Sequence, residues 1–268
     1  MRKQILRADD DLFKRPIVIV AAHPDDELIG LGSLLAHFQE IRAIVHTTDG
    51  APRTGPDVRN AGADTWLEYA QLRRDEFRAT LQAGEISPDR AICLWRPDQQ
   101  AAFRIPQLAL RLTSIFTRLR PRFVFTHSYE GGHPDHDSTA AAVHYAVACL
   151  RRAGSRSPRV LEFASYHASE GGIEAEAFLQ HSRAPFEHRA LDDAERLAKR
   201  KLLSAYASQR SVLSQFPLCY EPVRAAPEYD FSSPPHPGTL FYERLDWGMN
   251  GREWRRLAWA AQRRLSLS

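Results

Sequence analysis

Cysteine is scarce in this sequence of 268 residues, which contains only three, at Cys93, Cys149 and Cys219. An odd number of widely separated cysteines indicates neither a disulfide framework nor a cysteine-based zinc site. We expect free, buried thiols, which are typical of a reducing compartment, and we therefore expect a cytoplasmic protein.

Long apolar runs are also missing, so we expect no transmembrane segment. Residues 1–16 mix basic residues with three consecutive aspartates, Asp9, Asp10 and Asp11, and lack the apolar centre of a signal peptide. Charge of one sign is not in large excess either, because 36 basic residues against 33 acidic ones give a net charge of +3. Since a nucleic-acid-binding protein usually concentrates basic residues on one face, we expect no nucleic acid partner.

The composition supports a sizeable buried core, because 43% of the residues are hydrophobic and 10% are aromatic. We expect a single domain over residues 1–268. Short apolar runs predict strands at 16–22, 41–47, 91–95, 122–126 and 160–164, and helical periodicity predicts helices at 28–38, 64–83, 105–119 and 138–151. This alternation predicts an α/β fold with a parallel sheet, which binds ligands at the carboxyl ends of its strands.

The character of the sequence changes after residue 210. Segment 211–245 has six prolines between Pro217 and Pro237, and its aromatic residues predict an ordered loop packed on the body of the protein. A last helix is predicted over 251–265, where an apolar stripe lies opposite four arginines. We expect this helix to dock on its own domain, and a membrane surface or a partner is the alternative.

Two clusters of ionisable residues occupy equivalent places in the chain. The first, AHPDDE at residues 22–27, directly follows the first predicted strand, and the second, HPDH at residues 133–136, follows the fourth. Imidazole and carboxylate groups are ordinary zinc ligands, and a catalytic zinc site keeps three protein ligands and a water. A single His-Pro-Asp at a helix start is often only a capped turn, but two at one sheet edge indicate metal chemistry.

This pair of motifs resembles the LmbE-like or PIG-L family of zinc-dependent N-deacetylases. The resemblance extends from Pro16 to about Gln209 and implies a Rossmann-like open, mostly parallel sheet with helices on both faces. Members of the family typically remove an acetyl group from N-acetylglucosamine that is carried on a small molecule or a lipid. The resemblance therefore implies a small-molecule or lipid-linked amino-sugar substrate for this protein.

The resemblance also implies a role for each residue of the two motifs. The zinc ligands would be His23, Asp26 and His136. Asp25 would be the general base, and His133 would assist at the oxyanion or at the leaving group. Asp135 would orient His133.

Weaker features of the family are present outside the two motifs. Arg73 belongs to a segment that resembles an R-x-x-E pattern whose arginine faces the substrate, and Asp98 matches a position whose acid contacts sugar hydroxyls. A solvated helix charge or a turn residue is the alternative at each position. Residues 201–209 are similar to a late family helix ending in Ser-Gln, for which we expect core packing. The polar loop 51–65 and the proline-rich segment depart from the family, and they are the places where substrate choice would be set.

The chemistry expected of this site follows from general principles. Zinc lowers the pKa of a bound water to about 7, and a nearby carboxylate such as Asp25 can take the proton of that water. The leaving amine must be protonated in turn by Asp25 or His133. Fe²⁺ or another divalent metal would suit a His/Asp/His site as well as Zn²⁺ does, and the sequence leaves the homo-oligomeric state open.

Other functions remain compatible with the same residues. The substrate of an amidase could instead be a glycopeptide, an aminoglycoside precursor, a thiol-sugar conjugate or a longer acyl amide. A non-catalytic metal-binding or sugar-binding domain is a different class, against which Asp25 argues because metal binding alone does not need a base. Nucleotide binding is disfavoured, since Gly30-Leu31-Gly32 is only a fragment of the phosphate-binding G-x-G-x-x-G pattern.

Overall fold

The structure is a computed structural model that describes residues 11–181, 184–186, 189–245 and 247–267. The segment 1–16, for which we expect no signal peptide, lies mostly outside these residues, and so do Asp9 and Asp10. Over the described part of the chain, no helix is both long enough and apolar enough to cross a membrane. The expectation of a single domain over residues 1–268 stays a prediction.

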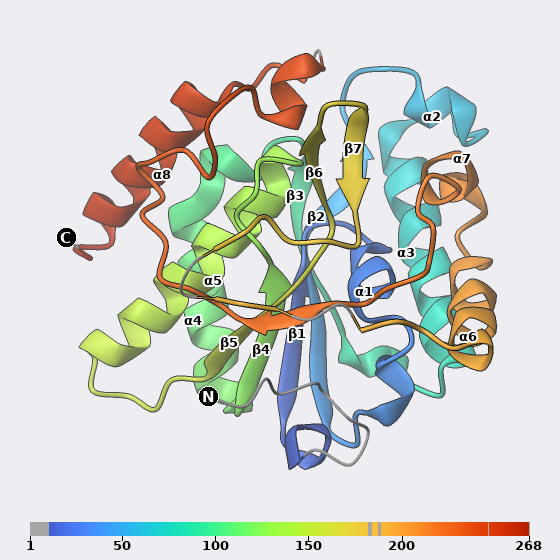
Figure 1. Cartoon of the computed structure of the whole chain (residues 1–268), viewed down its shortest axis with the longest axis horizontal. Coiled ribbons are helices and arrows are strands. Elements are labelled where there is room, and N and C mark those ends of the chain that lie inside the picture. The colour runs from blue at the N-terminus through green and yellow to red at the C-terminus, as the bar shows by residue number, and fades with distance from the viewer. Residues whose placement is uncertain (1–10, 182–183, 187–188, 246, 268) are drawn as a thin grey trace.

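A six-stranded sheet forms the centre of the fold, in the order β3-β2-β1-β4-β5-β8 (Figure 1). The first five strands run parallel, and β8 pairs antiparallel with β5. A separate hairpin consists of β6 and β7. The strands are β1 (Ile17–Ala21), β2 (Ile41–Pro52), β3 (Ala91–Asp98), β4 (Phe123–His127), β5 (Arg159–Phe163), β6 (Tyr166–Ser169), β7 (Gly172–Ala175) and β8 (Val223–Ala225).

Helices cover both faces of this sheet, as the family resemblance implied (Figure 1). The α-helices are α1 (Asp26–Leu31), α2 (Asp57–Asn60), α3 (Trp66–Ala83), α4 (Ile105–Leu119), α5 (Pro134–Arg152), α6 (Asp193–Leu203), α7 (Arg210–Leu213) and α8 (Gly251–Arg264). Short 3-10 helices are η1 (Asp11–Lys14), η2 (Leu35–His37), η3 (Pro88–Arg90), η4 (Ala101–Arg104), η5 (Ala207–Gln209) and η6 (Phe241–Arg244).

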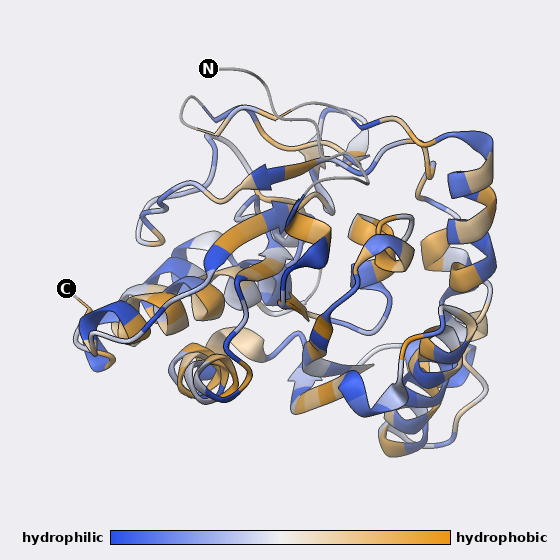
Figure 2. Ribbon diagram, turned by 90° about the horizontal axis from the view of Figure 1, so that it is seen from below, coloured by the Kyte–Doolittle hydropathy of each residue, from blue (hydrophilic) through white to orange (hydrophobic). Residues whose placement is uncertain are grey.

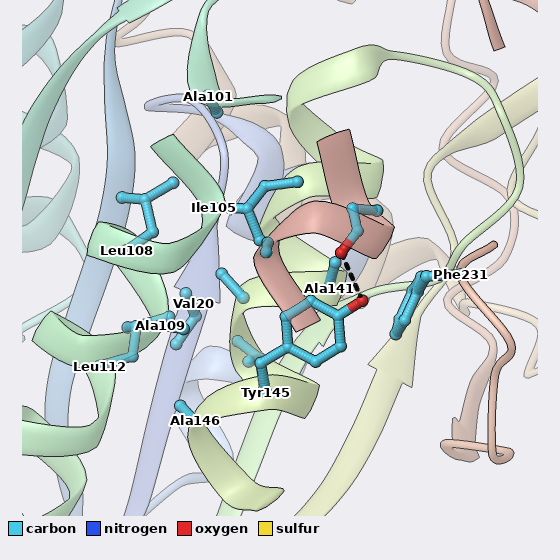
Figure 3. Close-up of a cluster of buried hydrophobic side chains, with 14 of the residues drawn as sticks. Val20, Ala101, Ile105, Leu108, Ala109, Leu112, Ala141, Tyr145, Ala146 and Phe231 are labelled. Carbon is cyan, nitrogen blue, oxygen red and sulfur yellow. Dashed lines mark hydrogen bonds between the residues drawn. The ribbon is translucent and has the colours of Figure 1, made fainter. Parts of the chain in front are cut away.

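Two apolar cores lie against the sheet, one on each face. Helices α4, α5 and α8 pack on one face, where Tyr145 of α5 donates a hydrogen bond to the Ala258 carbonyl of α8 at 3.1 Å (Figure 3). Helices α1 and α3 and the end of α6 pack on the other face. Every residue of β1 is buried, as expected of a central parallel strand (Figure 2 colours the chain by hydropathy).

Most elements expected from the sequence are present, but two helices have different limits. The helix predicted over 28–38 is wrong in its extent, because α1 ends at Leu31 and a 3-10 turn follows. Glycine at positions 30 and 32 weakens the helix, and a side chain at Gly32 would collide with Lys199. Helix α5 begins at Pro134, four residues before the predicted start, so part of the second motif lies in its first turn.

The C-terminal third contains both a confirmed expectation and an unexpected element. Helix α8 packs on α4 and α5, which confirms the docked helix. The proline-rich segment contributes β8, a short edge strand that the apolar pattern did not predict because only three residues pair. The rest of this segment packs against the core through residues such as Phe231 and Leu240, as expected of an ordered loop.

A buried ion pair joins α6 to the segment before β8. Lys199 Nζ lies 2.9 Å from Glu221 Oε1, and both side chains are fully buried. Lys199 also donates a hydrogen bond to the Ile29 carbonyl of α1 at 2.7 Å. Because the ammonium group is shared between two segments, it fixes α1 and the chain near residue 221 relative to each other.

We predict that Lys199→Met will lower the free energy of unfolding by about 3 kcal/mol, since it removes the nearer cation of the buried Glu221 carboxylate and leaves only Arg189, whose Nη1 lies 3.9 Å away. Thermal unfolding followed by circular dichroism measures this loss. The matched control is Lys201→Met, which changes an exposed lysine on the same helix and should leave the melting temperature nearly unchanged. Equal melting temperatures for the two variants would show that the buried pair contributes nothing.

Candidate metal centre and active site

The first motif forms a tight turn between β1 and α1. Asp25 stands at the start of the helix with φ 123°, a backbone conformation that residues other than glycine rarely adopt. Such strain costs about 1–3 kcal/mol and persists only where the surroundings impose it, often at functional sites. Asp26 follows as the first residue of α1, and its carboxylate accepts the His23 backbone N–H at 2.8 Å.

Two buried groups hold this strained turn in place. The Arg73 guanidinium of α3 donates to Asp25 Oδ2 at 3.1 Å, to the Gly50 carbonyl at 2.9 Å and to the Pro24 carbonyl. The Glu27 carboxylate accepts the Asp25 backbone N–H at 3.3 Å and contacts His46 Nε2 at 2.9 Å. Arg73 therefore holds the carboxylate of Asp25, and Glu27 holds its backbone N–H.

The second motif lies in the loop after β4 and in the first turn of α5. His133 is the N-cap residue, and its Nδ1 accepts the Asp135 backbone N–H at 3.1 Å. The Asp137 carboxylate accepts the Gly131 N–H at 3.1 Å, which closes the loop onto the helix. Gly132 is required at this point, since a Cβ atom there would lie 2.0 Å from the Tyr166 carbonyl oxygen.

The two motifs meet at Asp26. Its Oδ2 lies 3.2 Å from His23 Nδ1, and its Oδ1 lies 3.2 Å from His136 Nε2. One carboxylate of the first motif therefore touches a ring nitrogen from each motif. All three side chains are buried.

Several combinations of these side chains could hold a metal ion. Among the described residues, three groups bring their ligand atoms within 4.8 Å of one another: His23, His133 and His136; His23, Asp98, His133 and Asp135; and Asp26, His127 and His136. Imidazole nitrogen and carboxylate oxygen are the donors that Zn²⁺ and Fe²⁺ accept in proteins. The expected ligand set of His23, Asp26 and His136 overlaps these groups and stays a prediction.

His127, at the end of β4, was not among the residues expected in the site. Its Nε2 accepts the Ala22 backbone N–H at 2.9 Å, and its Nδ1 lies 2.9 Å from Ser165 Oγ. Burial and the neighbouring His136 lower the pKa of His127 to about 3, so its ring is neutral with the proton on Nδ1. Because the lone pair of Nε2 is already used, we predict that His127 lies next to the expected metal ligands rather than among them.

The second nitrogen of His23 faces two carboxylates. Its Nε2 lies 3.0 Å from Asp98 Oδ1 and 3.2 Å from Asp135 Oδ2. A histidine that binds a metal through one nitrogen commonly donates the other N–H to a carboxylate, which fixes its ring. This arrangement favours Nδ1, the atom that faces Asp26, as the nitrogen of His23 that is free for an ion.

The site concentrates buried negative charge. Burial raises the pKa of Asp25 to about 8, although the Arg73 guanidinium opposes this shift. Burial alone would also raise the pKa of Asp26, but the surrounding histidines hold it well below its usual value. Burial would lower the pKa of His23, yet Asp98 and Asp26 raise it well above the ordinary range. A divalent cation fits these donors, because it would offset the carboxylates gathered around His23.

Three expected site residues have contacts that differ from their expected roles. Arg73 was expected to face the substrate, but its side chain is 3% exposed in the structure, and its hydrogen bonds go to the Asp25 turn. Asp98 was expected to contact sugar hydroxyls, and its closest described partner is His23. The Asp135 carboxylate accepts the Gln99 and Ala101 backbone N–H groups, and the contact of Asp135 with His133 is made by its backbone N–H, so its orienting role stays a prediction. Substrate contacts of Arg73 and Asp98 stay predictions.

The R-x-x-E pattern and the late Ser-Gln pair contact each other. Glu76 Oε2 accepts the Ser208 hydroxyl at 2.6 Å, and Gln209 donates to the Tyr69 hydroxyl at 2.6 Å. These bonds fix the segment after α6 to α3, the helix that carries Arg73. The expected packing role of residues 201–209 is confirmed, although α6 itself ends at Leu203.

The fold and the site together define an open α/β domain with a candidate metal centre where β1 and β4 end. Comparison with known families specifies it further. Residues 18–147 match the PIG-L family model, described as GlcNAc-PI de-N-acetylase. This match confirms the resemblance to the PIG-L, or LmbE-like, family that the two motifs indicated.

Individual relatives are similar over part of their length. A 1D-myo-inositol 2-acetamido-2-deoxy-alpha-D-glucopyranoside deacetylase of Nocardioides sp. is 26% identical over 51% of this chain and 55% of its own length. The chain thus spans about half the length of the first curated relatives that it matches.

Solved structures show the same fold. The structure of the A40926 pseudoaglycone deacetylase has a TM-score of 0.58 at 17% identity and covers 79% of this chain and 96% of that one. The N,N'-diacetylchitobiose deacetylase of Pyrococcus horikoshii has a TM-score of 0.54 at 17% identity, with coverage of 82% and 88%.

We predict that the purified protein binds about one divalent ion per chain and that His23→Ala and His136→Ala each empty the site. His127→Gln should retain the ion, because glutamine can still accept the Ala22 N–H and no ligand is lost. Elemental analysis of the purified variants measures the bound metal. Loss of metal from His127→Gln combined with full loading of His23→Ala would move the site to Asp26, His127 and His136.

Proposed function

We propose that this protein is a metal-dependent hydrolase that removes an acetyl group from the amide nitrogen of an N-acetylglucosamine-like sugar conjugate. The observation that carries the proposal is Asp25, a buried and strained carboxylate beside Asp26, which contacts both His23 and His136. A site that only bound metal would not need this second carboxylate in a costly conformation. The deacetylase names of the relatives support the same reaction.

His23, Asp26 and His136 would hold the ion, with Zn²⁺ favoured by the donor set and Fe²⁺ as the alternative. When bound, such an ion supplies positive charge that makes water more acidic and polarises the amide carbonyl. Asp98 and Asp135 would fix the His23 ring through its Nε2.

Asp25 would act as the general base. Its Oδ2 is held by Arg73, while burial favours the protonated form and thus makes the carboxylate a better proton acceptor than an exposed one. A cation beside Asp26 would lower the pKa of Asp25 towards its ordinary value, since positive charge favours the carboxylate. The base would therefore be ionised at neutral pH and still able to accept a proton from the attacking water.

His133 would donate a hydrogen bond to the oxyanion. Its Nδ1 is occupied as an acceptor, so the proton of the neutral ring is on Nε2. Burial, with the neighbouring His23 and His136, keeps the pKa of His133 well below its ordinary value. A neutral Nε2–H group can stabilise negative charge without giving up its proton, which leaves Asp25 to return a proton to the leaving amine.

Substrate choice would depend on segments outside the two motifs. The relatives named above act on an inositol-linked acetamido sugar and on diacetylchitobiose. In this chain, residues 51–65 form the end of β2, the short α2 and the approach to α3. From the names of these relatives, we propose a small-molecule or lipid-linked amino-sugar substrate. Residues 51–65 are placed to contact it, because they follow Gly50, whose carbonyl accepts a hydrogen bond from Arg73 beside Asp25.

Release of amine from a panel of N-acetylated sugars, sugar conjugates and longer N-acyl amides tests the reaction and its substrate class. Metal content is measured on the same protein samples. Turnover that depends on the ion and is highest with N-acetylated amino sugars is expected. Absence of turnover with every compound in a metal-loaded sample would favour a binding domain.

We predict that Asp25→Asn keeps its metal while kcat falls by about 10²- to 10⁴-fold, the usual loss for a general base. Asparagine preserves volume but cannot accept a proton at neutral pH. In the wild type, activity should rise with pH as Asp25 ionises, and this acidic limb should disappear in the variant. Steady-state kinetics across the pH range measure both effects.

The control for this variant is Asp89→Asn, which alters an exposed aspartate of η3. It should retain wild-type kcat and the acidic limb. Near-normal turnover of metal-loaded Asp25→Asn would refute its role as the base and would assign that role to another group of the site.

A further inference from the structure

The loop that carries His133 is held by a segment from outside the matched family region. Phe241 N donates to the Gly131 carbonyl at 2.9 Å, and Tyr129 donates to the Ser233 carbonyl at 2.9 Å. The Trp254 indole donates to Ser138 Oγ at 2.9 Å and stacks on Tyr129 with ring centres 5.0 Å apart. The C-terminal segment, residues 226–265, thus contacts this loop and the first turn of α5 at several points.

One residue of the C-terminal segment reaches the site itself. The ring centre of Trp247 lies 4.5 Å from that of His133, at an interplanar angle of 49°. Trp247 is partly buried and packs against the core formed with α4, α5 and α8. Because the Trp247 indole packs against this core, it can restrict the motion of the His133 imidazole.

Among the described residues, three rings contact His133, and Trp247 is the one of them that lies outside the two motifs. His23 and His136 contact His133 with ring centres 4.6 and 5.1 Å away, and Asp98 Oδ1 lies 3.8 Å from its Nε2, beyond hydrogen-bond distance. The single described hydrogen bond of the ring is the one from the Asp135 N–H to Nδ1. One hydrogen bond does not by itself stop the ring from turning about its Cβ–Cγ bond, so the packed rings must restrict it, and Trp247 lies slightly closer than either histidine.

We propose that Trp247 is a positioning residue that holds the His133 imidazole with Nε2–H directed into the site, and that the C-terminal segment is thereby part of the catalytic unit. The inference rests on the proposed role of His133 as the oxyanion donor. Trp247 contacts His133 by ring packing alone, so it acts through the orientation of this side chain. A misaligned donor weakens stabilisation of the transition state more than binding of the substrate.

Trp247→Ala should lower kcat by roughly 3- to 10-fold, the range set by the loss of one aromatic contact, and leave KM within about twofold. Trp247→Phe should recover most of the loss, because it restores a planar aromatic face. Trp259→Ala is the matched control, since Trp259 lies on α8 of the same segment, is 48% exposed and stacks with Arg263 instead of a site residue. The control should keep wild-type kcat and KM.

A double-mutant cycle separates positioning from direct substrate contact. If Trp247 acts through His133, adding Trp247→Ala to His133→Ala should cause no further loss of kcat. Additive losses would overturn the proposal, because they would mean that Trp247 contacts the substrate independently. A rise in KM without a change in kcat in Trp247→Ala would overturn it as well.

A spectroscopic readout tests the same point without any substrate. Proton–nitrogen correlation spectra of the imidazole rings, with the His133 signals assigned by their loss in His133→Ala, report the tautomer of His133. Wild-type protein should show the proton on Nε2, because the Asp135 N–H occupies Nδ1. In Trp247→Ala the ring should turn away from this hydrogen bond for part of the time, so a mixture of tautomers is expected. An unchanged tautomer in a folded Trp247→Ala or Trp247→Leu variant would refute the positioning role, whereas failure of the proposed reaction would leave this spectrum as predicted.

Discussion

The parallel pairing of β1 with β4 is the constraint on which the site depends. Two other strands, β2 and β3, separate them in sequence, yet Val20 and Thr126 are register partners, so the chain leaves both strands at the same edge. The sheet order reverses here, because β2 lies on one side of β1 and β4 on the other. Open α/β sheets bind ligands at such a point. The AHPDDE motif directly follows β1, and the HPDH motif follows the loop after β4.

Much of the fold could be predicted because its signals are local. Each of the five parallel strands contains a short apolar run, although β2 continues beyond its run to Pro52, and helix α4 has the limits that its periodicity predicts. The hairpin of β6 and β7 and the edge strand β8 were missed, since their partly exposed residues lack the apolar pattern of buried strands. The early end of α1 at Leu31 was missed, although the glycines at positions 30 and 32 are a local signal of a weak helix.

The site shows the same division between local and long-range information. Motif spacing could place His23, Asp26 and His136 at one sheet edge, because the first motif directly follows β1 and the second follows the loop after β4. It could not show that Arg73 turns inward to Asp25 or that Asp98 faces His23, since these contacts depend on how α3 and β3 pack. His127 gave a weak signal, a histidine that ends an apolar strand, and Trp247 gave none in a segment without regular structure.

The buried carboxylates of the candidate metal centre need nearby positively charged or polar partners. Asp25, Asp26, Asp98 and Asp135 are enclosed together, and a buried carboxylate without a partner is costly. Arg73 supplies one fixed positive charge, and the histidines supply polar contacts whose charge depends on their environment. The helices on both faces thus stabilise an arrangement that would not be stable alone, and a bound cation would remove much of its electrostatic cost.

Backbone N–H groups give two neighbouring histidines opposite tautomers. The Ala22 N–H occupies Nε2 of His127, which leaves its proton on Nδ1, directed at Ser165. The Asp135 N–H occupies Nδ1 of His133, which leaves its proton on Nε2. Two identical side chains near Asp26 are therefore chemically different: one has no free lone pair for an ion, and the other presents a donor. Because both N–H donors belong to the two motifs, the chain segments that carry the expected ligands also set the tautomers of these two histidines.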